Sequence, residues 1–389
     1  MSWIAERSHY KKMLGEEKMM TNIPWVRALL ICITFGFLVL ARQPTLVHAQ
    51  QHAEPRMPKF QLEPFWRKPL PDRWITGEVG GSCFDAQDHL FTVNRGNLTP
   101  KEQVLGVVSP GVVEFDKNGA VVNSWGDRNI LPRKLHSCFV DYEGNIWIAG
   151  NEDSIVQKYS HDGSKLLLQI GTKGHFDTSD GTINGAPMNS SHELLNLPAS
   201  VAVDATNGDI YVADGYGNRR VVVFDREGHF LRQWGRQGTV AGVDAGEGGV
   251  FLKVVHYVVL GNDGLVYVCD RLGGRIQVFD KMGNFKRNIL VQSNTARLTG
   301  IGSVCQLSFS PDPAQKYIYI CNCGDEEIRI VDHATGRTLG TFGRSGFEAG
   351  EFNGLHSIAV DSSGNLVTAE AGVVTGGGHR LQMFRLVGD

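Results

Sequence analysis

The 389-residue sequence lacks the features that define several classes of protein. Lys and Arg total 38 against 41 Asp and Glu, and no run of like charges stands out, so a nucleic-acid-binding or polybasic membrane surface is not supported. Seven cysteines are too sparse for a disulfide scaffold. Glycine, by contrast, is abundant at 47 residues. This abundance favours many tight turns, and therefore an all-β fold over a helical bundle.

The N-terminal region has the pattern of a targeting segment. Residues 28–41 are uncharged and apolar, follow several Lys and Arg residues, and precede Val47-His48-Ala49, which is small at positions −3 and −1. The run is shorter than the ~20 apolar residues of a spanning helix. We therefore predict a signal peptide within residues 1–49 and a secreted or periplasmic protein. Membrane attachment through residues 28–41 is the alternative if the segment is not cleaved.

A strand–turn–strand phrase recurs six times, as in VDYEGNIWIAG from Val140 and VDATNGDIYVADG from Val203. Each phrase is followed by a second hairpin, which gives four short strands per unit. The large residue of the second strand recurs every 48 to 64 positions, at Phe91, Trp147, Tyr211, Tyr267, Tyr319 and Val367. Such a period is typical of propeller blades and predicts a six-bladed β-propeller over residues 73–389.

The ring is expected to close at its N-terminal side. The last unit ends in HRLQMFRL from His379, and a strand around residues 73–79 is predicted to complete it and remove the open edge. Residues 50–72 contain five prolines and are predicted to be an extended lead-in. Most cysteines after residue 49 are expected to be buried thiols. The Cys321-x-Cys323 pair is too close for an easy mutual disulfide.

Three histidines share one register in the repeats. His136, His256 and His356 each lie 11 residues before the large residue of units two, four and six. The same offset in units one, three and five falls on Gly80, Ser200 and Ser308. Because first strands line a propeller's channel, the three histidines should converge on the axis. Three imidazoles predict a catalytic Zn²⁺ site with an open fourth position. Hydrogen bonding within the channel wall is the alternative.

Further candidate residues follow the second strand, on the rim of the channel. Arg95 and Arg271 lie four residues after their large residues, in units one and four, which are opposite in a ring of six. They could hold an anionic substrate, or form ion pairs between blades. Tyr216, five residues after Tyr211, could serve as a base if nearby cations lower the pKa of its phenol. Otherwise it is a loop aromatic.

These stretches resemble the peptidyl-α-hydroxyglycine α-amidating lyase family, whose catalytic core is an NHL-repeat propeller. The similarity rests on LHSCFVDYEGNIWIAG, on DGY-x-N-R and on DR-x-x-GRIQ-x-F. It implies a lyase that splits a peptidyl or N-acyl α-hydroxyglycine into an amide and glyoxylate. By position, the resemblance places the zinc ligands on His136, His256 and His356, the active-site tyrosine on Tyr216, and the active-site arginines on Arg95 and Arg271. Arg271 is expected to pair with the substrate carboxylate, and Arg95 to support the tyrosine or the substrate. These two roles could be exchanged.

The sequence also departs from the family. Gly354-Leu355-His356-Ser357 replaces a common Met-Pro-His-Asp, whose Asp helps to hold a structural Ca²⁺, so Ser357 makes a Ca²⁺ site doubtful. Gly217 and Val278 stand where the family has disulfide cysteines, so we expect a different stabilising scheme or none. No counterpart of the family's copper monooxygenase domain is recognised. A separate monooxygenase is therefore expected to supply a small-molecule or peptide substrate, and a monomer is expected.

Two alternative functions remain open from the sequence. One is a non-catalytic NHL-repeat propeller that binds a protein or glycan partner, with vestigial histidines. The other is a propeller hydrolase of the gluconolactonase and regucalcin kind, which centres a divalent metal on carboxylate and Asn ligands. Four residues offer such groups: Asp214, Asp270, Asn322 and Glu370.

Overall fold

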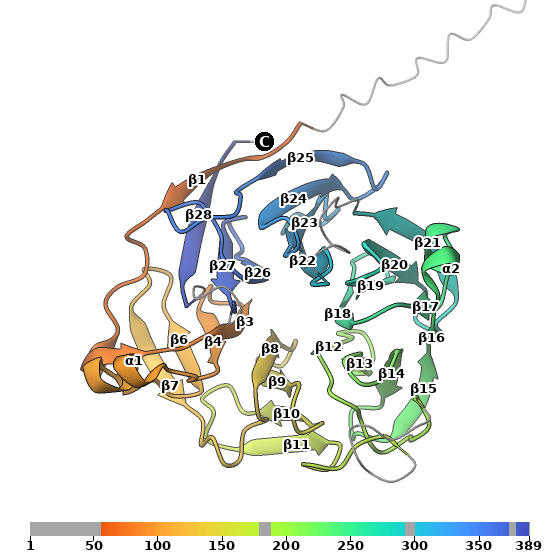
Figure 1. The fold of residues 1–389 in the computed structure, drawn as a ribbon, viewed down its shortest axis with the longest axis horizontal. Coiled ribbons are helices and arrows are strands. Elements are labelled where there is room, and N and C mark those ends of the chain that lie inside the picture. Colours follow the sequence, from red (N-terminus) through yellow and green to blue (C-terminus); the bar gives the residue numbers. More distant parts are fainter. Residues whose placement is uncertain (1–55, 179–187, 292–299, 373–378, 389) are drawn as a thin grey trace, which may run out of the picture. The chain divides into compact units, whose positions relative to one another are not determined.

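Six four-stranded antiparallel sheets form the computed structural model, which describes residues 56–178, 188–291, 300–372 and 379–388. Figure 1 shows the sheets arranged around a central axis, with the chain running from orange to blue around the ring. The predicted all-β, six-bladed propeller is therefore confirmed. The predicted signal segment lies outside the described residues. Among the residues that are described, no helix is long and apolar enough to cross a membrane.

Each blade runs from an inner strand at the axis to an outer strand at the periphery. Blades one and two comprise β3 (Val79–Phe84), β4 (Leu90–Asn94), β6 (Val112–Phe115), β7 (Val121–Trp125), and β8 (Leu135–Val140), β9 (Ile146–Gly150), β10 (Val156–Tyr159), β11 (Leu166–Ile170). Blades three and four comprise β12 (Ser200–Val203), β13 (Ile210–Asp214), β14 (Arg220–Phe224), β15 (Phe230–Trp234), and β18 (Val255–Leu260), β19 (Val266–Asp270), β20 (Arg275–Phe279), β21 (Phe285–Leu290). Blades five and six comprise β22 (Val304–Phe309), β23 (Tyr317–Asn322), β24 (Glu327–Asp332), β25 (Thr338–Phe342), and β26 (Leu355–Val360), β27 (Leu366–Glu370), β28 (Leu381–Gly388), β1 (Lys59–Glu63).

Short elements decorate the loops between the blades. Two parallel pairs link β2 (Trp74–Ile75) to β5 (Val107–Val108) and β16 (Arg236–Gln237) to β17 (Val250–Phe251). The helical segments are η1 (Pro71–Arg73), α1 (Pro100–Leu105) and α2 (Val240–Asp244). Thr99 caps α1 by accepting a hydrogen bond from the backbone N–H of Glu102. None of these elements replaces a blade strand.

The strand that closes the ring is β1, not the strand expected around residues 73–79. β1 pairs antiparallel with β28 from Phe60↔Leu386 to Glu63↔Met383, so it is the outer strand of blade six. It lies inside the segment predicted as a lead-in. Val79 instead begins the inner strand of blade one. The five residues of β1 lie between Pro58 and Pro64, which made a paired strand look like part of an irregular lead-in.

The hydrophobic core is divided into six clusters, one between each pair of neighbouring blades. Both faces of each sheet are covered, so the second strands are buried along their whole length. The large residues that define the repeat are all buried in this core: Phe91, Trp147, Tyr211, Tyr267, Tyr319 and Val367. The repeat thus reflects the packing of one blade on the next.

Four cysteines form disulfides, which corrects the expectation that most are buried thiols. Cys83 on β3 is bonded to Cys138 on β8, and this disulfide links blades one and two. Cys305 is bonded to Cys323 within blade five. Cys321 is a free buried thiol, so the Cys-x-Cys pair does not form a mutual disulfide. The chain has a stabilising scheme of its own, as the absence of cysteine at 217 and 278 led us to expect.

Candidate active site

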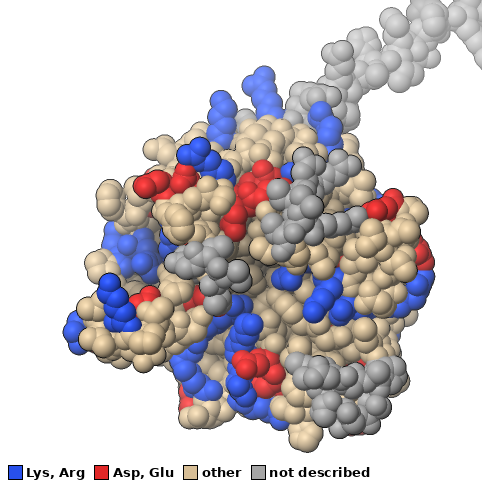
Figure 2. All heavy atoms as spheres, viewed as in Figure 1, with Lys and Arg blue, Asp and Glu red and all other residues tan. Residues whose placement is uncertain are grey.

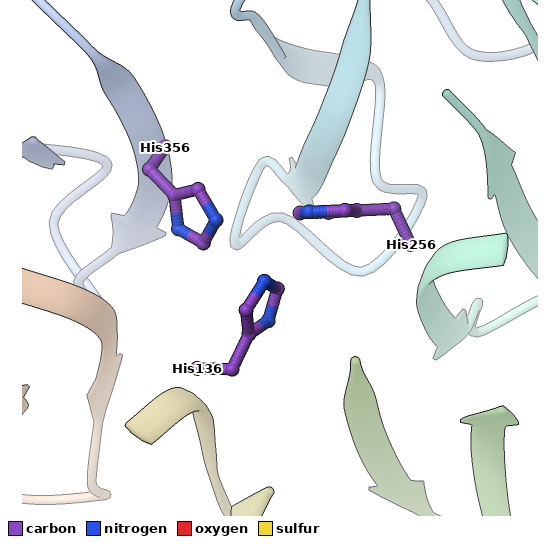
Figure 3. A group of neighbouring side chains, drawn as sticks. All are labelled: His136, His256 and His356. Carbon is purple, nitrogen blue, oxygen red and sulfur yellow. The ribbon is translucent and has the colours of Figure 1, made fainter. Parts of the chain in front are cut away.

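The three predicted histidines meet at the axis of the propeller. His136 lies on β8, His256 on β18 and His356 on β26, and Figure 3 shows their rings pointing toward one another. The ring centroid of His136 lies 4.8 Å from that of His256 and 4.6 Å from that of His356. The centroids of His256 and His356 are 5.2 Å apart. One ligand nitrogen from each ring lies within 4.8 Å of the other two.

A bulge in the inner strand positions each histidine. The pairing of β8 with β9 jumps from Leu135↔Gly150 to Ser137↔Ala149, which leaves His136 as the extra residue. His256 and His356 occupy the same place in blades four and six. A bulge redirects a side chain locally, and here it turns the imidazoles toward the axis.

In blades one, three and five, the residues at the place of the histidines are only partly those predicted. Gly80 lies at the bulge of blade one, as expected. In blade five the bulge residue is Cys305 rather than Ser308. In blade three the residue before β12, Ala199, takes the place expected for Ser200. The first hairpins of these two blades are longer than those of the others. Counting back 11 residues from the large residue therefore stops short of the equivalent position.

Each histidine is held by the neighbouring blade through Nδ1. The Nδ1 atoms of His136, His256 and His356 lie 2.8, 2.5 and 2.8 Å from the carbonyl oxygens of blades three, five and one, respectively. These oxygens belong to Ala199, Cys305 and Gly80. Because a carbonyl only accepts, Nδ1 carries the proton in each ring. Each Nε2 therefore presents a lone pair to the axis, the arrangement typical of metal-binding histidines.

Burial keeps the three imidazoles neutral. It lowers the pKa of His136 and His256 well below the usual range. The two other imidazoles and then Arg95 lower the pKa of His136 further, and Arg271 and then His356 lower that of His256. Burial, followed by the charges of Arg95 and Arg271, lowers the pKa of His356 to about 3. The neutral form is the one that ligates metals. The site is therefore poised to bind a cation at neutral pH.

The three Nε2 atoms lack enough donors among the described residues. The Tyr216 hydroxyl lies 3.0 Å from Nε2 of His136 and 3.1 Å from Nε2 of His256, yet it has one proton for these two acceptors. No described hydrogen bond reaches Nε2 of His356. Three convergent lone pairs with one shared proton fit a metal ion. Three nitrogen ligands with an open fourth position fit catalytic zinc.

The rim of the channel is a ring of six equivalent residues. In each, the backbone N–H donates to the carbonyl of a residue just before the inner strand of the same blade, at 2.7 to 3.3 Å. In blade order these residues are Arg95, Asn151, Tyr216, Arg271, Cys323 and Ala371. The predicted rim residues Arg95, Tyr216 and Arg271 thus lie in blades one, three and four. Each of the six follows the last residue of the second strand of its blade by one or two positions.

Tyr216 and Arg271 contact each other beside the histidines. Nη1 of Arg271 donates to the phenol oxygen at 3.2 Å, and the guanidinium carbon lies 5.5 Å from the centre of the Tyr216 ring. Nε of Arg271 is buried, and none of the described residues forms a hydrogen bond with it. The cation supports negative charge on the phenol oxygen and has donors left for an anionic ligand.

Arg95 is held more firmly by the protein itself. Its Nη1 donates to the buried carboxylate of Glu78 at 2.6 Å, and its Nε donates to the carbonyl of Leu135 at 3.0 Å. The ion pair lies within blade one, and the carbonyl bond reaches blade two. The alternative of an ion pair between blades is therefore wrong for this arginine, because only its hydrogen bond to the Leu135 carbonyl crosses to blade two. Arg95 also lines the cavity above the histidines, so a ligand could reach it.

A cavity of about 200 Å³ opens above the histidines. Its lining includes His356, Tyr216, Arg95 and Arg271, and Figure 2 shows Lys and Arg side chains around the hollow at the centre of this face. Three further lining residues have charged or amide side chains that were not predicted from the sequence: Lys134, Asn151 and Glu326. Asn151 could have been found, because it lies four residues after Trp147, the same offset as the arginines.

The residues named for a carboxylate-centred metal site serve another purpose. Asp214 pairs with Arg220 at 2.9 Å, Asp270 with Arg275 at 3.0 Å, and Glu370 with Arg380 at 2.7 Å. The amide of Asn322 donates to Asp325 and Glu327. The described lining of the cavity includes none of the four. These groups tie strand ends together within their blades and do not form a metal centre.

Ser357, at the position of the family's calcium ligand, is also engaged. Its buried hydroxyl lies 2.9 Å from Oγ of Ser82 and accepts from the backbone N–H of Ser82 at 3.0 Å. This contact joins blade six to blade one. Ser357 therefore acts as a link between strands.

Comparisons with known proteins support this architecture. An NHL-repeat model matches residues 195–224, which span β12 to β14. The solved structure of a streptogramin B lyase superposes with a TM-score of 0.50 at 14% identity, over 84% of this chain and 98% of that one. This likeness shows the fold alone. The chain is thus an NHL-repeat-containing six-bladed propeller.

Curated relatives confirm the predicted resemblance to the amidating-lyase family. Peptidyl-glycine α-amidating monooxygenase B of Xenopus laevis is 27% identical over 55% of this chain and 24% of its own length. Peptidyl-α-hydroxyglycine α-amidating lyase 1 of Drosophila melanogaster is 28% identical over 51% and 33%. NHL repeat-containing protein 3 of Homo sapiens is 31% identical over 57% of each. The chain spans a quarter to just over half of the length of these relatives. The two amidating relatives support a lyase-like enzyme.

Proposed function

We propose that the protein is an exported, zinc-dependent lyase that cleaves the C–N bond of a peptidyl or N-acyl α-hydroxyglycine. The products are an amide and glyoxylate. One observation carries the proposal: three histidine Nε2 atoms converge on the axis beside a phenol that Arg271 contacts. The lyase relatives support the same chemistry. His136, His256 and His356 would hold the zinc, which when bound supplies a Lewis-acid charge for the hydroxyl oxygen of the substrate.

The side chains around the cavity divide the remaining tasks. Arg271, whose Nε has no partner within the described part of the chain, binds the substrate carboxylate. Tyr216 in its tyrosinate form accepts the proton of the substrate hydroxyl, and Arg271 stabilises the charge on the phenol oxygen. Arg95, anchored by Glu78, supplies a second fixed positive charge at the rim.

The bond changes balance without a further reactant. As the hydroxyl proton leaves, the electron pair of the O–H bond forms the C=O bond of glyoxylate, and the C–N bond breaks. The electrons of that bond pass to the nitrogen, which takes up the proton from Tyr216 and becomes the nitrogen of the amide. The reaction is an elimination that uses no water, so the cavity needs only to hold one substrate.

The biological setting follows from the same proposal. Export rests on the apolar N-terminal run, and the protein would act as a monomer on a small-molecule or peptide substrate. Because the lyase consumes a hydroxylated glycine, a separate monooxygenase would have to supply it. No nucleic acid is expected as a partner, because basic and acidic residues are balanced.

The proposal is tested with purified protein and α-hydroxyhippurate, by measuring glyoxylate before chelation, after chelation and after zinc is restored. We expect release that chelation abolishes and zinc recovers, and we expect none from His256→Ala. If His256→Ala keeps stoichiometric zinc and full turnover, the assignment of the histidines is wrong. If the wild type binds no zinc and releases no glyoxylate, the chain acts instead as a binding propeller.

A further inference from the structure

Asn151 occupies the blade-two place in the ring of rim residues, between Arg95 of blade one and Tyr216 of blade three. Its side chain lines the cavity and the residue is only 8% exposed. Its Oδ1 is buried and has no hydrogen-bond partner among the described residues. Most buried polar atoms in folded proteins have a partner, so an amide oxygen without one, on a residue that lines a cavity, points to a ligand.

The cavity has a surplus of donors and few free acceptors. Its three cationic side chains, which can only donate, are Arg95, Lys134 and Arg271. The carboxylate of Glu326 is already engaged, because it accepts from the backbone N–H groups of Gly354 at 2.9 Å and Leu355 at 2.8 Å. Apart from the phenol and the imidazole already assigned to the reaction, Asn151 Oδ1 is the uncommitted side-chain acceptor of the described lining.

We propose that Asn151 binds the substrate, with Oδ1 accepting a hydrogen bond from the N–H of the amide that is cleaved. This inference rests on the proposed function. The reacting carbon carries a carboxylate, a hydroxyl and an amide nitrogen. Arg271 takes the carboxylate and Tyr216 the hydroxyl, so the N–H is the one polar group that still needs an acceptor. Asn151 therefore selects secondary amides, and a substrate whose nitrogen lacks hydrogen loses this contact.

The experiment pairs two enzymes with two substrates. N-Benzoyl-α-hydroxyglycine has the N–H, and its N-methyl derivative does not. We expect the wild type to show about tenfold lower kcat/KM with the N-methyl substrate, a loss typical of one hydrogen bond. Asn151→Ala should lose about tenfold on the parent substrate and no longer distinguish the two. Asn151→Asp, which keeps an acceptor in the same place, should still distinguish them.

Asn322→Ala is the matched control. Asn322 is buried at the end of the corresponding strand of the opposite blade, and its Oδ1 also lacks a partner, but it does not line the cavity. Its variant should keep the wild-type ratio between the two substrates. Zinc content and Tm, measured for every variant, show that the site and fold are intact.

Two results would overturn the inference. If Asn151→Ala distinguishes the substrates as sharply as the wild type does, Asn151 does not bind the N–H, although the lyase assignment stands. If the wild type releases no glyoxylate from either substrate, the proposed function fails and the role of Asn151 fails with it.

Discussion

Tyr216→Phe removes one oxygen atom from the candidate active site and leaves the aromatic ring in place. That oxygen lies within 3.2 Å of three groups: Nε2 of His136, Nε2 of His256 and Nη1 of Arg271. If the phenol only linked these groups, its loss would cost about 1 kcal/mol, or roughly fivefold in rate. If it is the base, the loss is that of general-base catalysis, about 10²- to 10⁴-fold in kcat, or roughly 3–5 kcal/mol.

We expect the larger loss, with KM and zinc content close to those of the wild type. KM should hold because Arg271 still binds the carboxylate, and zinc should hold because the three imidazoles remain. The assay is steady-state glyoxylate release at saturating α-hydroxyhippurate. Tyr257→Phe is the control, because Tyr257 lies next to His256 on β18 but lines a different cavity, toward the other end of the inner strands. A kcat for Tyr216→Phe within fivefold of wild type would refute the role of the phenol as base.

Three further predictions follow from the same contacts. Arg271→Lys should raise KM for α-hydroxyhippurate about tenfold while zinc content is unchanged, because an ammonium cannot replace the forked guanidinium; an unaltered KM would assign the carboxylate to Arg95 instead. The metal-free protein should lose about 2 kcal/mol of unfolding free energy from His356 alone between pH 6.5 and 5. The unfolded imidazole takes up a proton there and the folded one, with its pKa lowered to about 3, does not; urea unfolding at both pH values should show a smaller loss in His356→Asn. Cys83→Ser should lower the unfolding free energy by about 2–4 kcal/mol, because Cys83–Cys138 closes a loop of 55 residues; an equal loss in Cys138→Ser would identify the disulfide as the cause.

The sequence alone predicted the features that repeat. Trp147 and Tyr267 recur because each blade packs a large residue of its second strand against its neighbour, so packing sets the period. The histidine register was readable because the distance from bulge to large residue is the same in blades two, four and six. It failed in blades three and five because their first hairpins are longer, which moves the equivalent positions to Ala199 and Cys305.

Features that depend on contacts between distant residues were not readable from the sequence. β1 was missed because its partner β28 lies more than 300 residues away, and nothing local in KFQLE distinguishes an edge strand from a lead-in. The Cys83–Cys138 bond requires the side-by-side placement of two inner strands. The roles of Glu78 and Glu326 are likewise invisible in sequence, because each is defined by what its carboxylate contacts.

The central claim is that the three histidines, Tyr216 and Arg271 cleave a C–N bond without water. The most direct test is to incubate the zinc-loaded protein with α-hydroxyhippurate and to quantify benzamide, benzoate and glyoxylate together. We expect equal amounts of benzamide and glyoxylate, in proportion to the fraction of protein loaded with zinc, and no benzoate. Benzoate as the aromatic product, or unchanged substrate in the presence of bound zinc, would contradict it.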